Sequence, residues 1–242
     1  MRDEIFVDRT QVGDFVFDEG VADVFDDMLD RSIPFYDEIQ RMSVELSRSF
    51  LEEEGGTVYD VGSSTGNTLV RLMKAISPKT RVKFVGVEPS AAMRARCREK
   101  IRAEGLGHEV DILEDSVECL PDLPGARVVI MLFTLQFVRP PQRDAVLAKI
   151  CASIEPGGAL LLGEKVLGDD NDLSRVYIDL YHDYKERSGY SRTEIAKKRE
   201  ALENVLVPYR VSENRDALLK AGFSRVDEVF RWYNFVVYLA VR

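Results

Sequence analysis

The sequence predicts an α/β protein in which a mostly parallel β-sheet is covered by helices on both faces. Short runs rich in Val, Ile, Leu and Phe alternate with segments of helical periodicity, as in βαβ units. The 242 residues, 45% of them hydrophobic, are enough for one buried core. We therefore expect a single domain over residues 1–242, with an N-terminal helical cover at 1–50 and a helical insertion at 170–205.

The first five strands are predicted at 58–62, 82–88, 109–113, 127–133 and 158–165, because each is a brief apolar run. Helices are predicted between them at 66–76, 89–104 and 140–154. In the third helix Val146, Ile150 and Ile154 share one face, and Pro140 suits the first turn. Strands joined through helices in this way run parallel.

Further helices are predicted before and after these five strands in the sequence. Segments 21–30 and 34–50 precede the first strand, and the apolar stripe of the second includes Phe35 and Ile39. Two helices fill the insertion at 170–205, and Ser191 with Glu194 forms a capping box at the start of the second. A last helix begins at Ser212 and ends at Gly222, because glycine adopts the left-handed closing conformation.

The last two strands are predicted at 224–231 and 234–241. Only Tyr233 and one neighbour separate them, which permits an antiparallel hairpin but no crossover. We therefore expect a mostly parallel seven-stranded sheet whose last strand runs against the others.

Charge and composition exclude several classes of function. The formal net charge is -9, and residues 1–30 hold ten acids and two bases, which disfavours direct nucleic-acid binding. The longest apolar runs fall short of the roughly 20 residues that span a bilayer, and the N-terminus lacks a secretory pattern. Three cysteines without close spacing predict neither a disulfide framework nor a metal cluster. We expect a cytoplasmic protein that binds no membrane.

The stretch "VYDVGSSTG" joins the first strand to the first following helix. Gly62 and Gly66 permit a tight turn that exposes backbone N–H groups beside the positive end of a helix. The spacing fits the dinucleotide pattern G-x-G-x-x-G poorly. It resembles the nucleoside loop of class I S-adenosylmethionine-dependent methyltransferases, acid-x-Gly-x-Gly-x-Gly, with Asp60 as the acid and Ser64 in place of the middle glycine. The alternative is an ordinary turn between a strand and a helix.

Two further acids follow neighbouring strands. Glu88 closes the second strand, where a carboxylate can accept hydrogen bonds from both ribose hydroxyls of a nucleoside. Asp115 follows the third strand and can accept from an adenine amino group, with Ser116 as a neighbouring backbone donor. Each acid alone is also consistent with a solvated loop residue. Together with the glycine loop they predict a ligand site at the carboxyl edge of the sheet.

Four longer segments resemble the carboxy-S-adenosyl-L-methionine synthase family: "FDEGVADVFDDMLDRSIPFY", "FTLQF", "EPGGALLLGEK" and "YSRTEIAKKREALENV". The similarity runs from about Gly13 to the last strand. It implies a Rossmann-like class I methyltransferase fold and a homodimer. It also implies conversion of S-adenosyl-L-methionine and prephenate to carboxy-S-adenosyl-L-methionine and phenylpyruvate through a sulfonium ylide, for the wobble uridine of bacterial tRNA.

The resemblance also implies roles for individual residues. It implies that Arg199 recognises the added carboxylate, which a guanidinium grips through two parallel hydrogen bonds. Taken alone, "KKRE" in a helix is more often a solvated face. The other implied ligand contacts are Gly62, Ser63 and Ser64 for the amino-acid part, Glu88 and Pro89 for the ribose, Asp115 and Ser116 for the adenine, and Tyr36 and position 132.

The sequence departs from the family pattern at two places. Leu132 stands where the family commonly has an asparagine, and Glu88 with Pro89 replaces an Asp-Asn pair. Lys165, at the end of the fifth strand, is a candidate site cation or an exposed structural lysine, and His182 is interpreted as a helix-surface residue. Three functions remain open: carboxy-S-adenosyl-L-methionine synthesis, methyl transfer to a small molecule, and binding of S-adenosyl-L-methionine without catalysis.

Overall fold

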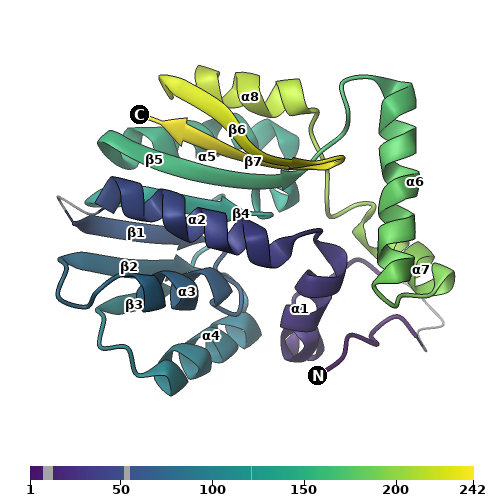
Figure 1. Cartoon of the computed structure of the whole chain (residues 1–242), viewed down its shortest axis with the longest axis horizontal. Helices are drawn as coiled ribbons and strands as arrows, with labels where there is room; N and C mark the ends of the chain where they lie inside the picture. Colours follow the sequence, from purple (N-terminus) through teal and green to yellow (C-terminus); the bar gives the residue numbers. More distant parts are fainter. Residues whose placement is uncertain (8–12, 52–54, 121) are drawn as a thin grey trace.

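A computed structural model describes residues 1–7, 13–51, 55–120 and 122–242. Its centre is a seven-stranded sheet in the order β3-β2-β1-β4-β5-β7-β6 (Figure 1). The strands are β1 Gly56–Val61, β2 Val82–Val87, β3 Val110–Leu113, β4 Ala126–Leu132, β5 Ile154–Lys165, β6 Arg225–Trp232 and β7 Phe235–Val241. The α-helices are α1 Glu19–Ser32, α2 Tyr36–Leu51, α3 Asn67–Ala75, α4 Ala91–Glu104, α5 Pro140–Ser153, α6 Asn171–Arg187, α7 Arg192–Leu202 and α8 Val211–Lys220, and η1 Leu135–Phe137 is a short 3-10 helix.

The predicted sheet topology is confirmed. Strands β1 to β5 pair in parallel, whereas β7 is antiparallel to both β5 and β6. Only Tyr233 and Asn234 join β6 to β7, and Tyr233 takes a positive φ of 42° in this turn. The short connection therefore sets the direction of the last strand, as the sequence predicts.

Several predicted boundaries differ from the observed ones by one to four residues, and two of them have a clear cause. β5 begins at Ile154 rather than at residue 158, because Ile154 already pairs with Ala126 before the register shifts. α8 begins at Val211 instead of Ser212, since the backbone N–H of Arg210 donates to the Glu213 carboxylate in a capping box there. The capping box predicted at the start of α7 is confirmed. Residues 8–12 of the predicted N-terminal cover lie outside the described residues.

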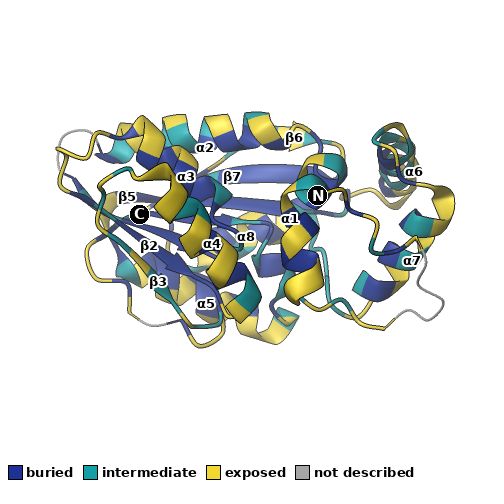
Figure 2. Cartoon of the chain, turned by 90° about the horizontal axis from the view of Figure 1, so that it is seen from below, coloured by how far each residue is buried: buried dark blue, intermediate teal, exposed yellow. Residues whose placement is uncertain are grey.

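Helices cover both faces of the sheet. α2 and α3 lie on one side and α5 on the other, with the buried strands between them (Figure 2). α8 packs against α5 and against β6 and β7. Buried side chains such as Val58 and Phe84 form the core toward α2 and α3, and Leu160 and Tyr238 belong to the core toward α5 and α8. The central strands β1, β4 and β5 are thus covered on both faces, which explains their mostly apolar sequences, whereas the edge strand β3 is only partly buried.

Three helices gather beyond the carboxyl ends of the parallel strands. Figure 1 shows α1, α6 and α7 together on this side. The N-terminal segment joins them, because buried Asp3 accepts a hydrogen bond from the Tyr190 hydroxyl and pairs with Lys198 at 3.5 Å. The backbone N–H of Asp3 donates to Asp27 of α1 at 2.7 Å. Within the described ranges, no helix has the length and apolarity needed to cross a bilayer.

Candidate active site

A cavity of about 660 Å³ lies at the carboxyl edge of the parallel strands. Ligand pockets commonly measure roughly 300–1,000 Å³. The loops after β1, β2, β3 and β4, the end of β5, and helices α1, α6 and α7 all contribute to its wall. Asp115 is not among the lining residues, although its neighbours Ser116 and Val117 are. The predicted residues that line it are Tyr36, Gly62, Ser63, Ser64, Glu88, Pro89, Ser116, Leu132 and Arg199.

The loop after β1 turns through three left-handed residues. Gly62, Ser64 and Gly66 have φ values of 81°, 48° and 83°. Ser64, which stands where the superfamily pattern has its middle glycine, therefore adopts a conformation that glycine takes more readily. At Gly62 the reason for glycine is also steric, since a Cβ there would lie 2.3 Å from Oγ1 of Thr134.

Most backbone donors of this loop are used within the protein. The N–H groups of Gly62 and Ser63 donate to the carbonyl of Val87 at 2.8 and 3.1 Å, and that of Ser64 donates to Glu88 at 3.0 Å. The expectation that the turn exposes its N–H groups is thus wrong for these three residues. The cause is the end of β2, which passes within hydrogen-bonding distance of the loop.

Glu88 is held in place by two backbone groups. One carboxylate oxygen accepts from the N–H of Ser64 at 3.0 Å and the other from the N–H of Ser90 at 2.8 Å. Its side chain is buried at the cavity wall, and burial raises the pKa of the Glu88 carboxyl while the two hydrogen bonds oppose that rise. A carboxylate oxygen has more than one lone pair, so both oxygens retain capacity for ligand hydroxyl groups.

Several buried polar atoms beside the loop lack a partner among the described residues. They are Oδ2 of Asp60, Oγ of Ser63 and Oε1 of Gln40, and all three residues line the cavity. Burial, and then the nearby charge of Glu88, raises the pKa of Asp60 to about 7. Buried polar atoms are normally hydrogen-bonded. These three therefore fit a ligand that carries hydroxyl and amino groups, such as a nucleoside joined to an amino acid.

The opposite part of the wall carries positive charge. Arg199 of α7 lines the cavity, and no carboxylate of the described residues lies within 4.0 Å of it. Lys165 lines it from the end of β5, and burial followed by the charge of Arg199 lowers its pKa to about 8. Lys165 therefore lines the cavity and is not an exposed lysine. His182 is partly exposed on α6 and also lines the cavity, and burial lowers its pKa.

Sequence reasoning missed other residues of the wall, including Tyr181 and Lys185 of α6 and Phe133 after β4. A signal existed in α6, because Ile178, Tyr181 and Lys185 recur at helical spacing and all three line the cavity. Leu132 lines the cavity as well, and its side chain lies against Gly163, where a Cβ would be 2.8 Å from Cδ2 of Leu132. The part of the chain that the structure describes contains no group of three or more His, Cys, Asp or Glu side chains that could hold a metal ion.

Comparisons with known proteins agree with this arrangement. A family model described as a methyltransferase domain matches residues 58–158. A putative S-adenosyl-L-methionine-dependent methyltransferase from Methanococcus maripaludis superposes with a TM-score of 0.62 at 17% identity, covering 97% of each chain, which shows a shared fold.

Relatives at higher identity extend over the whole chain. Carboxy-S-adenosyl-L-methionine synthase of Methylococcus capsulatus is 45% identical over 242 residues, covering 100% of this chain and 99% of that protein. The protein of the same name from Desulfotalea psychrophila is 42% identical over 243 residues, covering 100% of this chain and 97% of that protein. The chain therefore belongs to the carboxy-S-adenosyl-L-methionine synthase family within the class I methyltransferase superfamily.

Proposed function

We propose that this chain converts S-adenosyl-L-methionine and prephenate to carboxy-S-adenosyl-L-methionine, phenylpyruvate and water. The observation that carries the proposal is a single cavity with the Glu88 carboxylate in one part of its wall and Arg199 in another. The names of its relatives, which include carboxy-S-adenosyl-L-methionine synthase at 45% identity, support it.

The charge of Arg199 distinguishes this function from ordinary methyl transfer. The sulfonium of S-adenosyl-L-methionine is itself positive, so a fixed cation nearby is unfavourable unless an anion lies between them. Carboxy-S-adenosyl-L-methionine supplies such an anion, because it carries a carboxylate on the former methyl carbon. A guanidinium binds that group through two parallel hydrogen bonds.

The remaining assignments follow the family pattern and the geometry of the wall. In this proposal Gly62, Ser63 and Ser64 contact the amino-acid part, Glu88 and Pro89 the ribose, and Ser116, Tyr36 and Leu132 the rest of the ligand. The adenine contact of Asp115 follows the family pattern alone, because Asp115 does not line the cavity. Glu88 has the strongest support, because both of its oxygens are already oriented by backbone N–H groups.

The overall reaction balances without a metal or a redox partner. Prephenate loses one carboxylate as carbon dioxide and its ring hydroxyl as its ring becomes aromatic. A carbon–carbon bond forms between that carbon dioxide and the sulfonium methyl carbon, which gives up a proton. The proton and the hydroxyl leave together as water. A fixed cation at Arg199 stabilises negative charge on the carboxyl group during transfer.

Mass spectrometry tests the proposal. Purified protein incubated with S-adenosyl-L-methionine and prephenate should form a nucleoside heavier by the mass of one carbon dioxide, together with phenylpyruvate. Arg199→Ala should weaken binding of carboxy-S-adenosyl-L-methionine by about tenfold to a hundredfold and that of S-adenosyl-L-methionine much less. Arg192→Ala is the matched control, because Arg192 is an exposed arginine of the same helix outside the cavity wall. Equal losses for both ligands would remove the selective role of Arg199.

Methyl transfer to a small molecule is the second candidate, and the presence of Leu132 in the cavity wall favours it. Leucine cannot form the hydrogen bond of the usual family asparagine. In that case the same incubation, supplied with an acceptor, would accumulate S-adenosylhomocysteine and a methylated product. A binding protein without catalysis would retain the nucleoside and form neither product.

The proposal places the protein in the cytoplasm, where its product serves a separate enzyme that modifies the wobble uridine of tRNA. The free thiols of Cys97, Cys119 and Cys151 are consistent with a reducing compartment. Direct contact with tRNA is not part of the proposal, since the formal net charge of the chain is -9.

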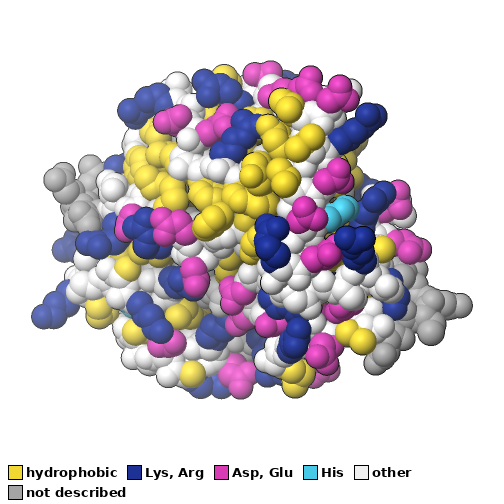
Figure 3. Space-filling view, turned by 45° about the vertical axis from the view of Figure 1, so that its right-hand side comes forward, with side chains coloured by type: hydrophobic (Ala, Val, Ile, Leu, Met, Phe, Trp, Pro, Cys, Tyr) yellow, Lys and Arg dark blue, Asp and Glu magenta, His cyan; other side chains and the backbone are white. Residues whose placement is uncertain are grey.

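A homodimer is also proposed. Figure 3 shows hydrophobic side chains gathered on one face of the molecule. Phe35, Val176 and Tyr233 are 58%, 50% and 41% exposed, and contacts between the rings of Phe35 and Phe230 and between those of Tyr177 and Tyr233 extend this surface. Exposed apolar patches of this kind often mark protein interfaces. Analytical ultracentrifugation tests it, and a purely monomeric protein at micromolar concentration would contradict it.

A further inference from the structure

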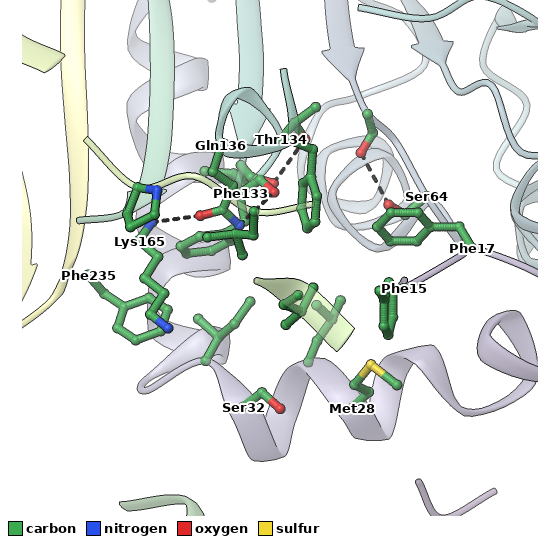
Figure 4. Close-up of a pocket in the computed structure, with 18 of the residues that line it drawn as sticks. Phe15, Phe17, Met28, Ser32, Ser64, Phe133, Thr134, Gln136, Lys165 and Phe235 are labelled. Carbon is green, nitrogen blue, oxygen red and sulfur yellow. Dashed lines mark hydrogen bonds between the residues drawn. The ribbon is translucent and has the colours of Figure 1, made fainter. Parts of the chain in front are cut away.

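The cavity has two chemically different ends. Figure 4 shows Ser64 with Phe15 and Phe17 at one end, and Lys165 with Phe235 at the other. Met28 and Ser32 of α1 lie along the cavity below them. The first end holds the loop and acids assigned to the nucleoside. The second end holds cations and aromatic rings that the nucleoside assignments leave unused.

Lys165 is positioned by its backbone. Its N–H donates to Oε1 of Gln136 at 3.0 Å, and Nε2 of the same glutamine donates to the carbonyl of Phe133 at 3.1 Å. Phe235 pairs with Lys165 across the antiparallel strands. The side chain of Lys165 extends into the cavity, where its Nζ lies 4.8 Å from the centroid of the Tyr181 ring.

Lys185 reaches the same aromatic ring from α6. Its side chain is buried, and its Nζ lies 5.5 Å from the ring centroids of both Tyr181 and Tyr190. The ammonium groups of Lys165 and Lys185 therefore both approach the ring of Tyr181, and both residues line the cavity.

Neither ammonium group has a close counterion. Among the described residues, no carboxylate lies within 4.0 Å of Lys165 or Lys185, and Asp3 and Glu194 act on Lys185 only at longer range. Lys198 differs, because its Nζ pairs with Asp3 at 3.5 Å and donates to Ser32 at 3.1 Å. The charge of Lys198 is thus compensated within the protein.

Buried cations without a counterion are unfavourable, and contact with an aromatic face compensates only part of the cost. Burial accordingly lowers the pKa of both lysines, to about 8 for Lys165. Arg199 adds a third positive charge to this end of the cavity. An anionic ligand would compensate these three positive charges at once.

We propose that Lys165 and Lys185 bind the carboxylate that the carboxyl-donating substrate keeps after transfer, with Tyr181 and Phe235 packed against its ring. This inference rests on the proposed function, in which the donor carries two carboxylates and Arg199 binds the one that is transferred. The retained carboxylate needs a second cationic site, and the two lysines supply it. The aromatic residues match the carbocyclic ring of the donor and of its arylpyruvate product.

Isothermal titration calorimetry with phenylpyruvate tests this subsite directly, because phenylpyruvate carries only the retained carboxylate. Lys165→Met and Lys185→Met should each weaken phenylpyruvate binding by about tenfold or more, while the affinity for S-adenosyl-L-methionine changes by less than about twofold. Lys165→Arg should keep most of the phenylpyruvate affinity. Lys220→Met, at an exposed lysine of α8 outside the cavity, is the control.

Stability separates a binding role from a structural one. Replacing an unpaired buried cation by an apolar side chain of similar volume should leave the melting temperature of Lys185→Met unchanged or higher. A lower melting temperature with equal losses for both ligands would show a structural role and overturn the inference. Unchanged phenylpyruvate affinity in both methionine variants would overturn it as well.

The wild-type protein separates this inference from the proposed function. If it forms the carboxylated nucleoside but the methionine variants bind phenylpyruvate normally, the subsite is refuted and the function stands. If it binds phenylpyruvate through the two lysines but forms no carboxylated nucleoside, the subsite stands and the function is refuted.

Discussion

Replacing Gly62 by alanine tests how the loop after β1 fits against the loop after β4. Gly62 has a φ of 81°, and a Cβ on it would lie 2.3 Å from Oγ1 and 2.5 Å from Cγ2 of Thr134. A left-handed conformation costs an alanine about 1–2 kcal/mol. Overpacking typically adds about 1–3 kcal/mol. We therefore expect Gly62→Ala to lower the free energy of unfolding by about 2–5 kcal/mol.

Gly107→Ala is the matched control. Gly107 has a φ of 68°, and a Cβ on it would meet nothing within 4 Å, so this substitution carries the backbone cost alone. Alanine also restricts the unfolded chain, which raises the free energy of unfolding by about 0.4–1 kcal/mol, and this contribution is common to both variants. The difference between them, about 1–3 kcal/mol, therefore measures the steric contact with Thr134.

Equilibrium unfolding in urea, followed by circular dichroism, gives these free energies from the midpoint and slope of each transition. Thr134→Ala removes both atoms that the new Cβ would meet most closely. Gly62→Ala should therefore cost about 1–3 kcal/mol less in the Thr134→Ala background than in the wild type. If Gly62→Ala is no more destabilising than Gly107→Ala, and the Thr134→Ala background leaves its cost unchanged, the steric reasoning is wrong.

Two further predictions concern the acids of the site. Glu88→Gln should weaken nucleoside binding in calorimetry by about tenfold to a hundredfold, because an amide cannot accept from the N–H groups of both Ser64 and Ser90; Glu155→Gln, at an exposed acid of β5, should leave it unchanged. The pKa of Asp60 is raised from 3.8 to about 7, so the folded protein holds an extra proton over this window and loses stability as the pH rises through it. Asp60→Asn should therefore be stabilising relative to the wild type at pH 8, by up to about 4 kcal/mol, and much less so at pH 4, as measured by urea unfolding; an equal difference at both pH values would contradict the raised pKa.

Much of the fold could be predicted because its signals are local. The central parallel strands are largely buried and so read as mostly apolar runs, and the direction of β7 follows from the short turn at Tyr233 and Asn234. The first part of the site could also be predicted. The glycine loop and Glu88 follow adjacent parallel strands, whose carboxyl ends lie at one edge of the sheet.

Other features of the site were decided by contacts between distant parts of the chain. Tyr190 and Asp3 are separated by 187 positions, yet their hydrogen bond joins the N-terminal segment to the helical insertion. This packing places Lys185 and Arg199 at the cavity instead of in solvent. A helical pattern indicates which residues share a face, but it does not indicate what that face will meet.

The sequence by itself therefore determined the approximate positions and the directions of the strands, the loop after β1 and the acid at the end of β2. Only the tertiary structure decided that the N–H groups of Gly62 and Ser63 are used by Val87, and that the cations of α6 and α7 face the same cavity as Glu88. The physical reason is that strand and turn preferences depend on neighbouring residues, whereas burial and the pairing of charges depend on which distant segments come together.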